Sequence, residues 1–452
     1  MAQNLTTRQA DELDPWVKRD LAMSMADAIA DLQKFLDSEW NPDLTVAEWW
    51  EKLGTEGWSA PAWPSAWFGR DLSREEAGRA AQTIQAHGAL GAPGGLGLLL
   101  AGPTIATHGT DEQKKKYLRD IVTGQASWCQ LFSEPGAGSD LAGLGCKAIK
   151  DGEEWIINGQ KVWTSGGQVA DHGMLIARTD PDQPKHAGIT WFAFDMHQPG
   201  VDIRPLKEMT GRALFNEVFL TDARVADSDI VGGLNNGWAV TNTTLMFERA
   251  GLGSGGHGAA GLATPGSVFG DLDKRAGDFV KPRTDGGGDA VGMLSGGYKV
   301  IVELAKGNGA IENPSIRQAL IKLHTLNELG RFNNLRLKAA KAAGQDIPGL
   351  PNISKLSMSE IVRQTRDVGL AVVGPYGTLH AYDRADRPAL DAATGNPFLP
   401  MVTEVALFAQ GPPIYGGTDQ VQRNIIGERV LGLPKEPGDL KNVPFKDLPK
   451  NG

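Results

Sequence analysis

The chain has 452 residues, 41% of them hydrophobic and 22% charged, which is the composition of an ordinary folded protein with room for two or three structural units. The net charge of −9, with no basic run other than Lys114–Lys116, argues against a nucleic-acid surface. Cys129 and Cys146 are too few for a disulfide framework and favour a reducing cytoplasm. Neither a secretory leader nor an apolar run of about 20 residues is present, so we expect no secretion and no membrane span.

Residues 1–127 are predicted to form a helical domain. Apolar residues recur at three- and four-residue spacing over 21–29 and over 77–85. Thr110-Asp111-Glu112-Gln113 is a capping box that predicts a helix start, and the lysines after it are expected on a solvated helix face. Most of the seven tryptophans before residue 68 are expected to pack in the core.

Residues 128–232 are predicted to form a compact β domain. Its first strand runs into a tight loop at 133–140, Ser-Glu-Pro-Gly-Ala-Gly-Ser-Asp, whose glycines let the backbone approach a ligand closely. Exposed N–H groups in such a loop suit a phosphate or a polar heterocycle. Over 151–167, two β-prone runs are joined by Asn158-Gly159, which predicts a hairpin turn at that dipeptide. Further strands are expected at 189–196, 201–206 and 214–220.

Residues 233–452 are predicted to form a C-terminal helical domain. Its first helix opens at Gly237-Trp238 and places Thr241, Thr244, Leu245 and Glu248 on neighbouring faces. Helical periodicity returns over 316–343 and 353–373.

Two motifs in order, 133–140 and Asn-Gly-x-Lys-x-Trp at 158–163, resemble the flavin-holding middle domain of acyl-CoA dehydrogenases. The resemblance extends over about 70–433 and implies an α+β fold with an N-terminal helical domain, a middle β-barrel-like domain and a C-terminal helical bundle. It implies FAD as the cofactor, acyl-CoA as the substrate, electron-transfer flavoprotein as the electron acceptor, and no metal. Relative to the family, residues of about 260–300 are in excess, and we interpret them as a loop insertion or a helix interruption with disorder. In a loop resembling the family's Trp-Pro-x-x-x-Gly-Gly-x-Gly, Phe68 replaces a glycine.

The resemblance also assigns roles to single residues. Phe132 and Ser133 match contacts to the flavin ring, and Trp163 and Ser165 match the pair behind that ring. The positions expected to bind FAD are Phe132, Ser133, Trp163, Ser165, Thr418 and Gln420, and those expected to contact acyl-CoA are Ser139 and Arg249.

The catalytic base is expected at Glu248. Many family members carry the base in a Tyr-Glu-Gly-Thr motif, but the sequence here is Tyr415-Gly416-Gly417-Thr418. A smaller branch, including isovaleryl-CoA and long-chain acyl-CoA dehydrogenases, carries it in the first C-terminal helix just before an arginine, where this chain has Glu248-Arg249. A buried carboxylate there would have a raised pKa suited to general-base work. Gly416 keeps the N–H that polarises the thioester oxygen in the family. Glu404 and Glu428 lie near the motif without a matching family role.

Two family motifs that complete FAD from a neighbouring subunit are incomplete. The only Phe-Gly in the region, Phe269-Gly270, has Gly266 where the family has arginine, and Ala371 stands where the family has glutamine. Either the chain is one subunit of an α2β2 hetero-oligomer, or it forms a homo-oligomer whose insertion supplies other contacts. An α,β-dehydrogenase is the first hypothesis; a flavin oxidase or monooxygenase relative and a non-catalytic partner subunit are the alternatives.

Overall fold

The computed structural model describes residues 25–252, 263–280, 297–345, 347–435, 440 and 442–449. The chain divides into two compact units, which are described one at a time below. The first comprises residues 1–205, 215–285 and 441–452, and the second comprises 206–214 and 286–440.

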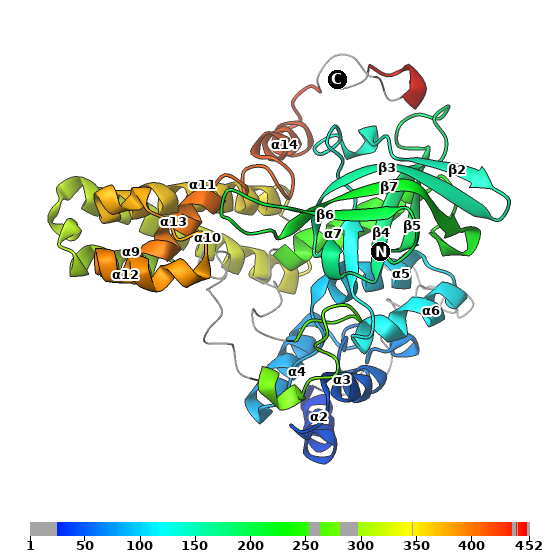
Figure 1. The fold of residues 1–452 in the computed structure, drawn as a ribbon, viewed down its shortest axis with the longest axis horizontal. Coiled ribbons are helices and arrows are strands. Elements are labelled where there is room, and N and C mark those ends of the chain that lie inside the picture. Colours follow the sequence, from blue (N-terminus) through cyan, green and yellow to red (C-terminus); the bar gives the residue numbers. More distant parts are fainter. Residues whose placement is uncertain are drawn as a thin grey trace. The chain divides into compact units, whose positions relative to one another are not determined.

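Helices form the N-terminal part of the first unit, as the periodicity predicts (Figure 1). Three of them begin at capping boxes in which the hydroxyl of Thr45, Ser73 or Thr110 accepts from the amide three residues on. The predicted cap at Thr110 is therefore confirmed. Trp49 and Trp50 are fully buried in a cluster with these helices, as expected of packing aromatics. The helices are α2 (Met25–Glu39), α3 (Val46–Thr55), α4 (Arg74–His87), α5 (Gly102–His108) and α6 (Asp111–Val122).

Phe68 adopts a backbone conformation that glycine adopts more easily. Its φ of 61° lies in the left-handed region, which costs about 1–2 kcal/mol for a residue with a Cβ. The next residue, Gly69, makes the close approach, because a Cβ there would lie 2.0 Å from the carbonyl oxygen of Trp63. The Phe68 side chain packs against the core and helps offset the backbone strain.

The described part of the predicted insertion is an ordered layer on the N-terminal helices. The backbone amides of Val46 and Ala47 donate to the carbonyls of Lys274 and Leu272, each at 2.9 Å. Phe279 is buried in the same cluster as the apolar faces of α2 to α4. The expectation of disorder is therefore wrong for residues 263–280, because this segment buries apolar side chains of its own. Of the rest of the predicted insertion, residues 260–262 and 281–296 lie outside the described residues, and residues 297–300 are helical.

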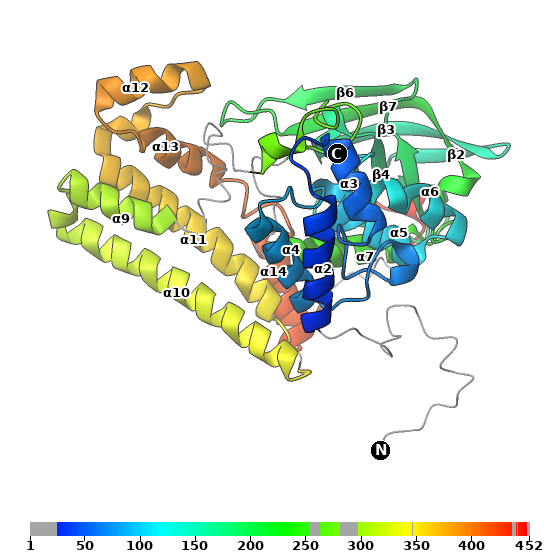
Figure 2. The ribbon, with the colours of Figure 1, turned by 90° about the horizontal axis from the view of Figure 1, so that it is seen from below.

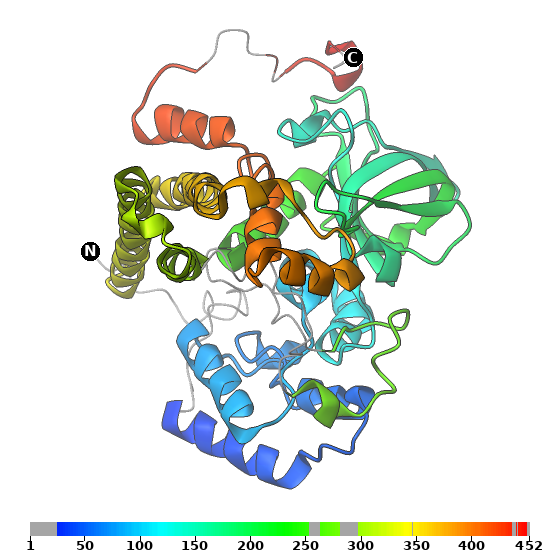
Figure 3. The same ribbon diagram turned by 60° about the vertical axis from the view of Figure 1, so that its left-hand side comes forward.

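An eight-stranded sheet makes up the β part of the first unit, and Figure 3 shows its curvature. The strand order is β6-β7-β3-β2-β4-β5-β8, with β1 pairing in parallel to β4. The alternating apolar side chains of these strands bury a second core that includes Trp155, Phe192 and Phe194. The strands are β1 (Trp128–Leu131), β2 (Lys147–Asp151), β3 (Glu154–Ser165), β4 (His172–Arg178), β5 (Ile189–Asp195), β6 (Val201–Leu206), β7 (Phe215–Ala226) and β8 (Ile230–Val231).

The predicted hairpin turn at Asn158-Gly159 is wrong. Strand β3 runs straight through the dipeptide, and the turn lies between Asp151 and Glu154, where Gly152 has a φ of 64°. At Asn158-Gly159 the pairing with β7 shifts register instead. Gly159 is required there because a Cβ would lie 2.8 Å from both Cα and Cβ of Cys146 on the adjacent chain segment.

Replacing Gly159 with alanine is expected to lower the free energy of unfolding by about 1–3 kcal/mol, the usual cost of overpacking a core. The Cys146 backbone is fixed by its hydrogen bonds and cannot move aside without disturbing the loop before β2. Thermal denaturation measures the effect. Gly78→Ala on α4 is the matched control, since nothing lies within 4 Å of its added Cβ, and an equal loss in both variants would contradict the packing argument.

Helix α7 (Gly237–Leu252) follows the sheet at the predicted start, Gly237, and belongs to the first unit with the strands. Gly237 packs against the backbone of Thr190, where a Cβ would lie 2.6 Å from its carbonyl carbon. The helix therefore begins directly against β5.

The second unit is a helical bundle. Its two long helices, α10 and α11, lie side by side in Figure 2, and they agree with the periodicity predicted over 316–343 and 353–373. None of the helices in the described ranges combines the length and apolar composition needed to cross a membrane. The helices are α9 (Gly297–Gly307), α10 (Pro314–Ala342), α11 (Leu350–Val373), α12 (Arg387–Thr394), α13 (Leu399–Phe408) and α14 (Asp419–Ile425).

Candidate functional site

A buried ion pair anchors the loop that follows β1. Lys161, on β3 and fully buried, donates from Nζ to Glu134 Oε1 at 2.8 Å and to the carbonyl oxygen of Phe132 at 3.1 Å. Glu134 also accepts from the backbone amides of Gly145 at 2.7 Å and Cys146 at 2.9 Å. Both charges are thus hydrogen-bonded on several sides, which offsets the cost of burying them. The sequence interpretation assigned neither residue a role, although a lysine inside an apolar β-strand is a signal for a buried partner.

The loop itself is a tight turn with its hydroxyls near the surface. Glu134 and Ala137 exchange two backbone hydrogen bonds of 3.1 Å, and the Ser133 carbonyl accepts from Val162 at 2.9 Å. Phe132 is buried in the core that α5, α6 and α7 share, Ser133 is half-buried, and Ser139 is exposed. Ser133 and Ser139 therefore stand at the two ends of one glycine-rich turn.

Beyond the anchor, β3 presents an exposed aromatic ring. The register with β7 shifts between Lys161 and Thr164, and Trp163 inside this bulge has a φ of 61°. The Trp163 side chain is 60% exposed and meets the ring of Phe215 edge-to-face at 5.8 Å. Ser165, two residues on, is also exposed. A flat apolar surface beside a hydroxyl suits a planar heterocycle, and the strained Trp163 backbone is typical of a binding site.

Helix α7 carries Glu248 to the same part of the first unit. Gln130, on β1, donates from Nε2 to Glu248 Oε2 at 3.2 Å, and Glu248 is half-buried. Because Gln130 lies two residues before Phe132, a single strand supplies both the contact to Glu248 and the start of the turn. The sequence interpretation did not identify Gln130, since its partner is 118 residues away.

Two side-chain contacts fix α7 against α5. The hydroxyls of Thr104 and Thr244 lie 3.0 Å apart and are fully buried, and His108 Nε2 lies 2.7 Å from the Thr243 hydroxyl. Burial lowers the pKa of His108, which favours a neutral imidazole in this contact. Arg249 follows Glu248 and is a predicted acyl-CoA contact. Its side chain lies outside the described residues.

The remaining predicted site residues lie in the second unit, in the turn before α14. Gly416 and Gly417 both have positive φ, 63° and 78°, and their carbonyls accept from Gln422 Nε2 at 3.1 and 3.3 Å. The Thr418 hydroxyl caps α14 by accepting from the amide of Val421 at 3.1 Å. Gln420 is exposed. The motif is therefore a turn held by Gln422 that leads into the capped helix α14.

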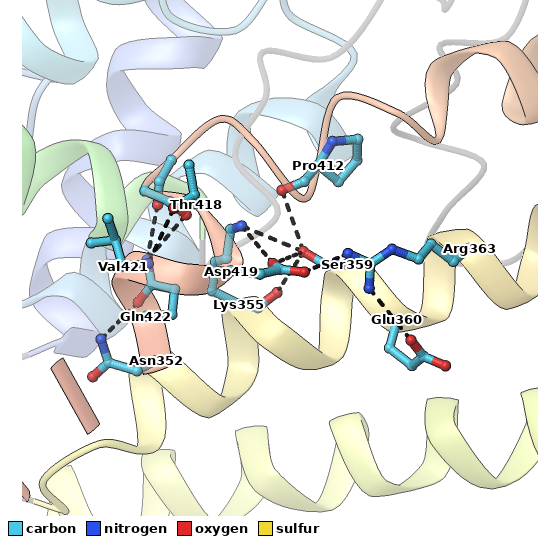
Figure 4. A network of polar contacts seen from close by, with 12 residues as sticks. Asn352, Lys355, Ser359, Glu360, Arg363, Pro412, Thr418, Asp419, Val421 and Gln422 are labelled. Atoms are coloured by element: carbon cyan, nitrogen blue, oxygen red, sulfur yellow. Dashed lines mark hydrogen bonds and ion pairs between the residues drawn. The ribbon is translucent and has the colours of Figure 1, made fainter. Parts of the chain in front are cut away.

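Asp419, which the sequence interpretation did not single out, connects this turn to α11 (Figure 4). Its carboxylate is almost fully buried and binds Lys355 Nζ at 3.1 Å, the Ser359 hydroxyl at 2.8 Å and Arg363 at 2.5 Å. Burial alone would raise the pKa of Asp419, but the hydrogen bonds from Ser359, Arg363 and Lys355 outweigh it and hold the pKa below its usual value. The carboxylate thus stays ionised and fixes the start of α14.

Replacing Asp419 with asparagine is expected to cost about 1.5–3 kcal/mol at neutral pH, the value of hydrogen bonds to a charged group. Since the folded-state pKa is depressed, this stability is fully present above the unfolded pKa of about 3.9 and is lost as pH falls through the folded value. Thermal melts from about pH 7 down to about pH 3 measure the effect. The melting temperatures of wild type and variant should converge as the pH falls. Asp367→Asn, which removes an exposed ion pair with Arg366, is the control; a pH-independent gap for Asp419→Asn would contradict the linkage.

Glu404, a weaker rival for the base, is occupied by other contacts. It is buried on α13 and forms ion pairs with Arg212 and, at 3.5 Å, with Arg387. These two arginines give the Glu404 carboxylate a structural role within the second unit. Glu428, the other rival, is half-buried in the turn after α14.

The incomplete subunit motifs lack the arginine and the glutamine of the family, whose positions are taken by Gly266 and Ala371. Phe269 is 47% exposed, and Gly266 is packed so that a Cβ would lie 2.2 Å from the Ser127 hydroxyl. Ala371 is exposed near the end of α11. In the ranges that the structure describes, no group of three or more His, Cys, Asp or Glu side chains is arranged to hold a metal ion.

Comparisons with known proteins show which family the chain resembles. Three sequence profiles match the chain: the N-terminal domain of acyl-CoA dehydrogenases over residues 20–125, the middle domain over 129–223 and the C-terminal domain over 283–431. The chain is 33% identical to acyl-CoA dehydrogenase IpdE1 of Mycobacterium tuberculosis over 388 residues, which covers 86% of this chain and 88% of that protein. It is 34% identical over 391 residues to acyl-CoA dehydrogenase FadE34 of the same organism, covering 85% of this chain and 46% of that one. Among solved structures, the ChsE4-ChsE5 complex from M. tuberculosis superposes with a TM-score of 0.64 at 25% identity, over 96% of this chain and all of that chain (100%).

Proposed function

The chain belongs to the acyl-CoA dehydrogenase family, and we propose that Glu248 is the base with which it converts an acyl-CoA thioester into the trans-2-enoyl-CoA. One observation carries the assignment. Glu248 is held by Gln130 at the head of the loop that would bind flavin, while the alternative base position in the C-terminal motif is Gly416.

FAD is the cofactor of this family, and the residues present fit it. Trp163 offers an exposed ring and Ser165, two residues on, an exposed hydroxyl. In this proposal Phe132 and Ser133 border the flavin ring from the β1 side, and Thr418 and Gln420 serve its phosphate and adenosine side. When bound, FAD supplies the acceptor for the hydride that leaves the substrate β carbon.

The residues of the chain perform the proton chemistry. The Glu248 carboxylate takes the α proton and becomes a carboxylic acid, while Gln130 keeps one oxygen in place. The Gly416 N–H is proposed to stabilise negative charge on the thioester oxygen. This backbone interaction does not need the glutamate side chain that many family members carry at the same position. Ser139 and Arg249 are proposed to contact the acyl-CoA.

The physiological substrate is proposed to be an acyl-CoA of fatty-acid or steroid side-chain breakdown, and the electron acceptor an electron-transfer flavoprotein. The ending at 423–434, which resembles the sterol branch of the family, supports the substrate class. Both cysteines are free and buried, and burial raises the pKa of Cys129 to about 12 and of Cys146 to about 11. Protonated, unpaired thiols support the proposed cytoplasmic location.

The oligomer is proposed to share its flavin sites between chains, as an α2β2 hetero-oligomer or a homo-oligomer. Gly266 and Ala371 leave one half of the site without its usual side chains, which supports a different partner chain. The similarity to a chain of the ChsE4-ChsE5 complex also supports a partner chain that differs from this one.

A panel of acyl-CoAs assayed with an artificial electron acceptor tests the function. The chain is purified alone and together with the product of a neighbouring gene, and its bound flavin is measured. Flavin bleaching by an acyl-CoA under anaerobic conditions, with slow reoxidation in air, is the expected result. Rapid reoxidation of the product-bound enzyme would instead identify an oxidase, and absence of flavin in every preparation would identify a non-catalytic partner.

A further inference from the structure

The C-terminal residues 442–449, here named the C-terminal strap, pair with the loop between β4 and β5 in the first unit. Pro444 forms a β-bridge with Pro184, and the backbone amides of Phe445 and Lys446 donate to the carbonyls of Gln183 at 2.9 Å and Pro181 at 3.0 Å. The strap lies beyond residue 431, where the C-terminal family profile ends. It is therefore an addition to the matched domains and needs its own explanation.

The strap covers a buried arginine. Arg178, the last residue of β4, is 3% exposed, and the ring of Phe445 lies over its guanidinium carbon at 3.8 Å. Among the described residues Arg178 forms no direct ion pair, although the carboxylates of Glu134, Asp140 and Asp180 lie near enough to stabilise its charge. Burial lowers the pKa of Arg178 to about 10, still well above neutral pH. A full positive charge is thus kept under a phenyl ring.

The charge is used to hold backbone carbonyls. Arg178 donates to the carbonyl of Lys185 at 2.6 Å and, through its other terminal nitrogen, to Ala142 at 2.6 Å and Leu144 at 3.3 Å. Lys185 in turn binds Asp140 with its Nζ at 2.7 Å. Arg178 therefore fastens the segment that begins directly after Ser139.

The same segment is fastened from its other end by Glu134, which binds the amides of Gly145 and Cys146. Residues 139–146 are thus held between Glu134 and Arg178. Of these two anchors, only Arg178 depends on the strap. The Phe445 ring keeps water from competing for the guanidinium N–H groups that bind the segment.

We propose that the C-terminal strap positions the substrate loop, residues 139–146, so that Phe445 acts through Arg178 to raise the affinity for the coenzyme A part of the substrate. The inference rests on the proposed role of Ser139 as an acyl-CoA contact. Phe445 and Arg178 are positioning residues and touch no reacting atom.

Phe445→Ala tests the strap in the full-length protein with its flavin bound. Isothermal titration with coenzyme A alone measures affinity, and steady-state assays separate KM from kcat. The dissociation constant and KM are expected to rise by about 3- to 30-fold, the factor for losing one partly desolvated cation–π contact. Flavin content and kcat should stay within about twofold of wild type, since the reacting groups are untouched.

Two matched variants complete the design. Phe445→Trp keeps a ring over the guanidinium and is expected to restore affinity. Lys446→Ala removes only the exposed ion pair with Asp182 and should leave affinity unchanged.

Equal dissociation constants for Phe445→Ala and Lys446→Ala would overturn the proposal, as would a parallel loss of flavin and kcat in Phe445→Ala, which indicates general destabilisation. Weaker coenzyme A binding in Phe445→Ala, with no dehydrogenation by any variant or by wild type, would support the strap and reject the proposed reaction.

Discussion

Replacing Glu248 with glutamine is expected to leave flavin bound and to slow its anaerobic reduction by acyl-CoA by about 10²- to 10⁴-fold, the range for a positioned general base. Glutamine has nearly the same shape and still offers Gln130 an oxygen acceptor at the 3.2 Å contact. The variant therefore loses the proton acceptor and keeps the packing of α7. Stopped-flow absorbance of the flavin at saturating acyl-CoA measures the rate.

The control is Glu428→Gln, which removes the glutamate nearest in sequence to the Tyr415–Thr418 motif. Its rate is expected to match wild type. A near-wild-type rate for Glu248→Gln combined with a large loss for Glu428→Gln would move the base to the second unit. A fall in flavin content for Glu248→Gln would show that the side chain is structural.

Features of the fold that depend on short stretches of chain were predictable. The cap at Thr110 and the helix start at Gly237 depend on a few consecutive residues, and the structure has both. The turn at Asn158-Gly159 was not predictable, because the conformation there is decided by partners far along the chain. Cys146 requires a residue without a Cβ at position 159, and Asp222 binds the Asn158 side chain. The Asn158-Gly159 dipeptide, usual in turns, thus lies inside a strand, where its glycine allows the close approach of Cys146.

The candidate site divides in the same way. Trp163, Ser165 and Glu248 could be proposed as site residues from the sequence because each belongs to a motif or to a fixed offset from one. Gln130 and Arg178 could not, since each acts through a contact to a residue far along the chain. Lys161 stands inside the motif at 158–163, but the motif does not indicate its ion pair with Glu134. The Arg178 contact to Phe445 spans most of the chain, and no local pattern announces it. The sequence therefore supplies candidates for ligand contact, whereas the groups that hold those candidates in place come from the structure.

The second large effect is expected at the buried ion pair. Lys161→Met leaves Glu134 with a charge that is 11% exposed and has lost its counter-ion. Removing one partner of a buried pair costs about 3–5 kcal/mol, because the other charge remains buried. The Phe132 carbonyl also loses its donor, so flavin affinity is expected to fall together with thermal stability.

The comparison that isolates burial is Lys52→Met, which breaks an ion pair of similar length, 2.7 Å to Glu39, with side chains 41% and 39% exposed. That variant should lose at most about 1 kcal/mol. Adding Glu134→Gln to Lys161→Met should recover part of the stability, because no uncompensated charge remains, but only part, since the amides of Gly145 and Cys146 then share one acceptor oxygen. If Lys161→Met and Lys52→Met melt at the same temperature, the pair does not hold the loop, and the order of residues 133–146 must come from the contacts of Arg178 instead.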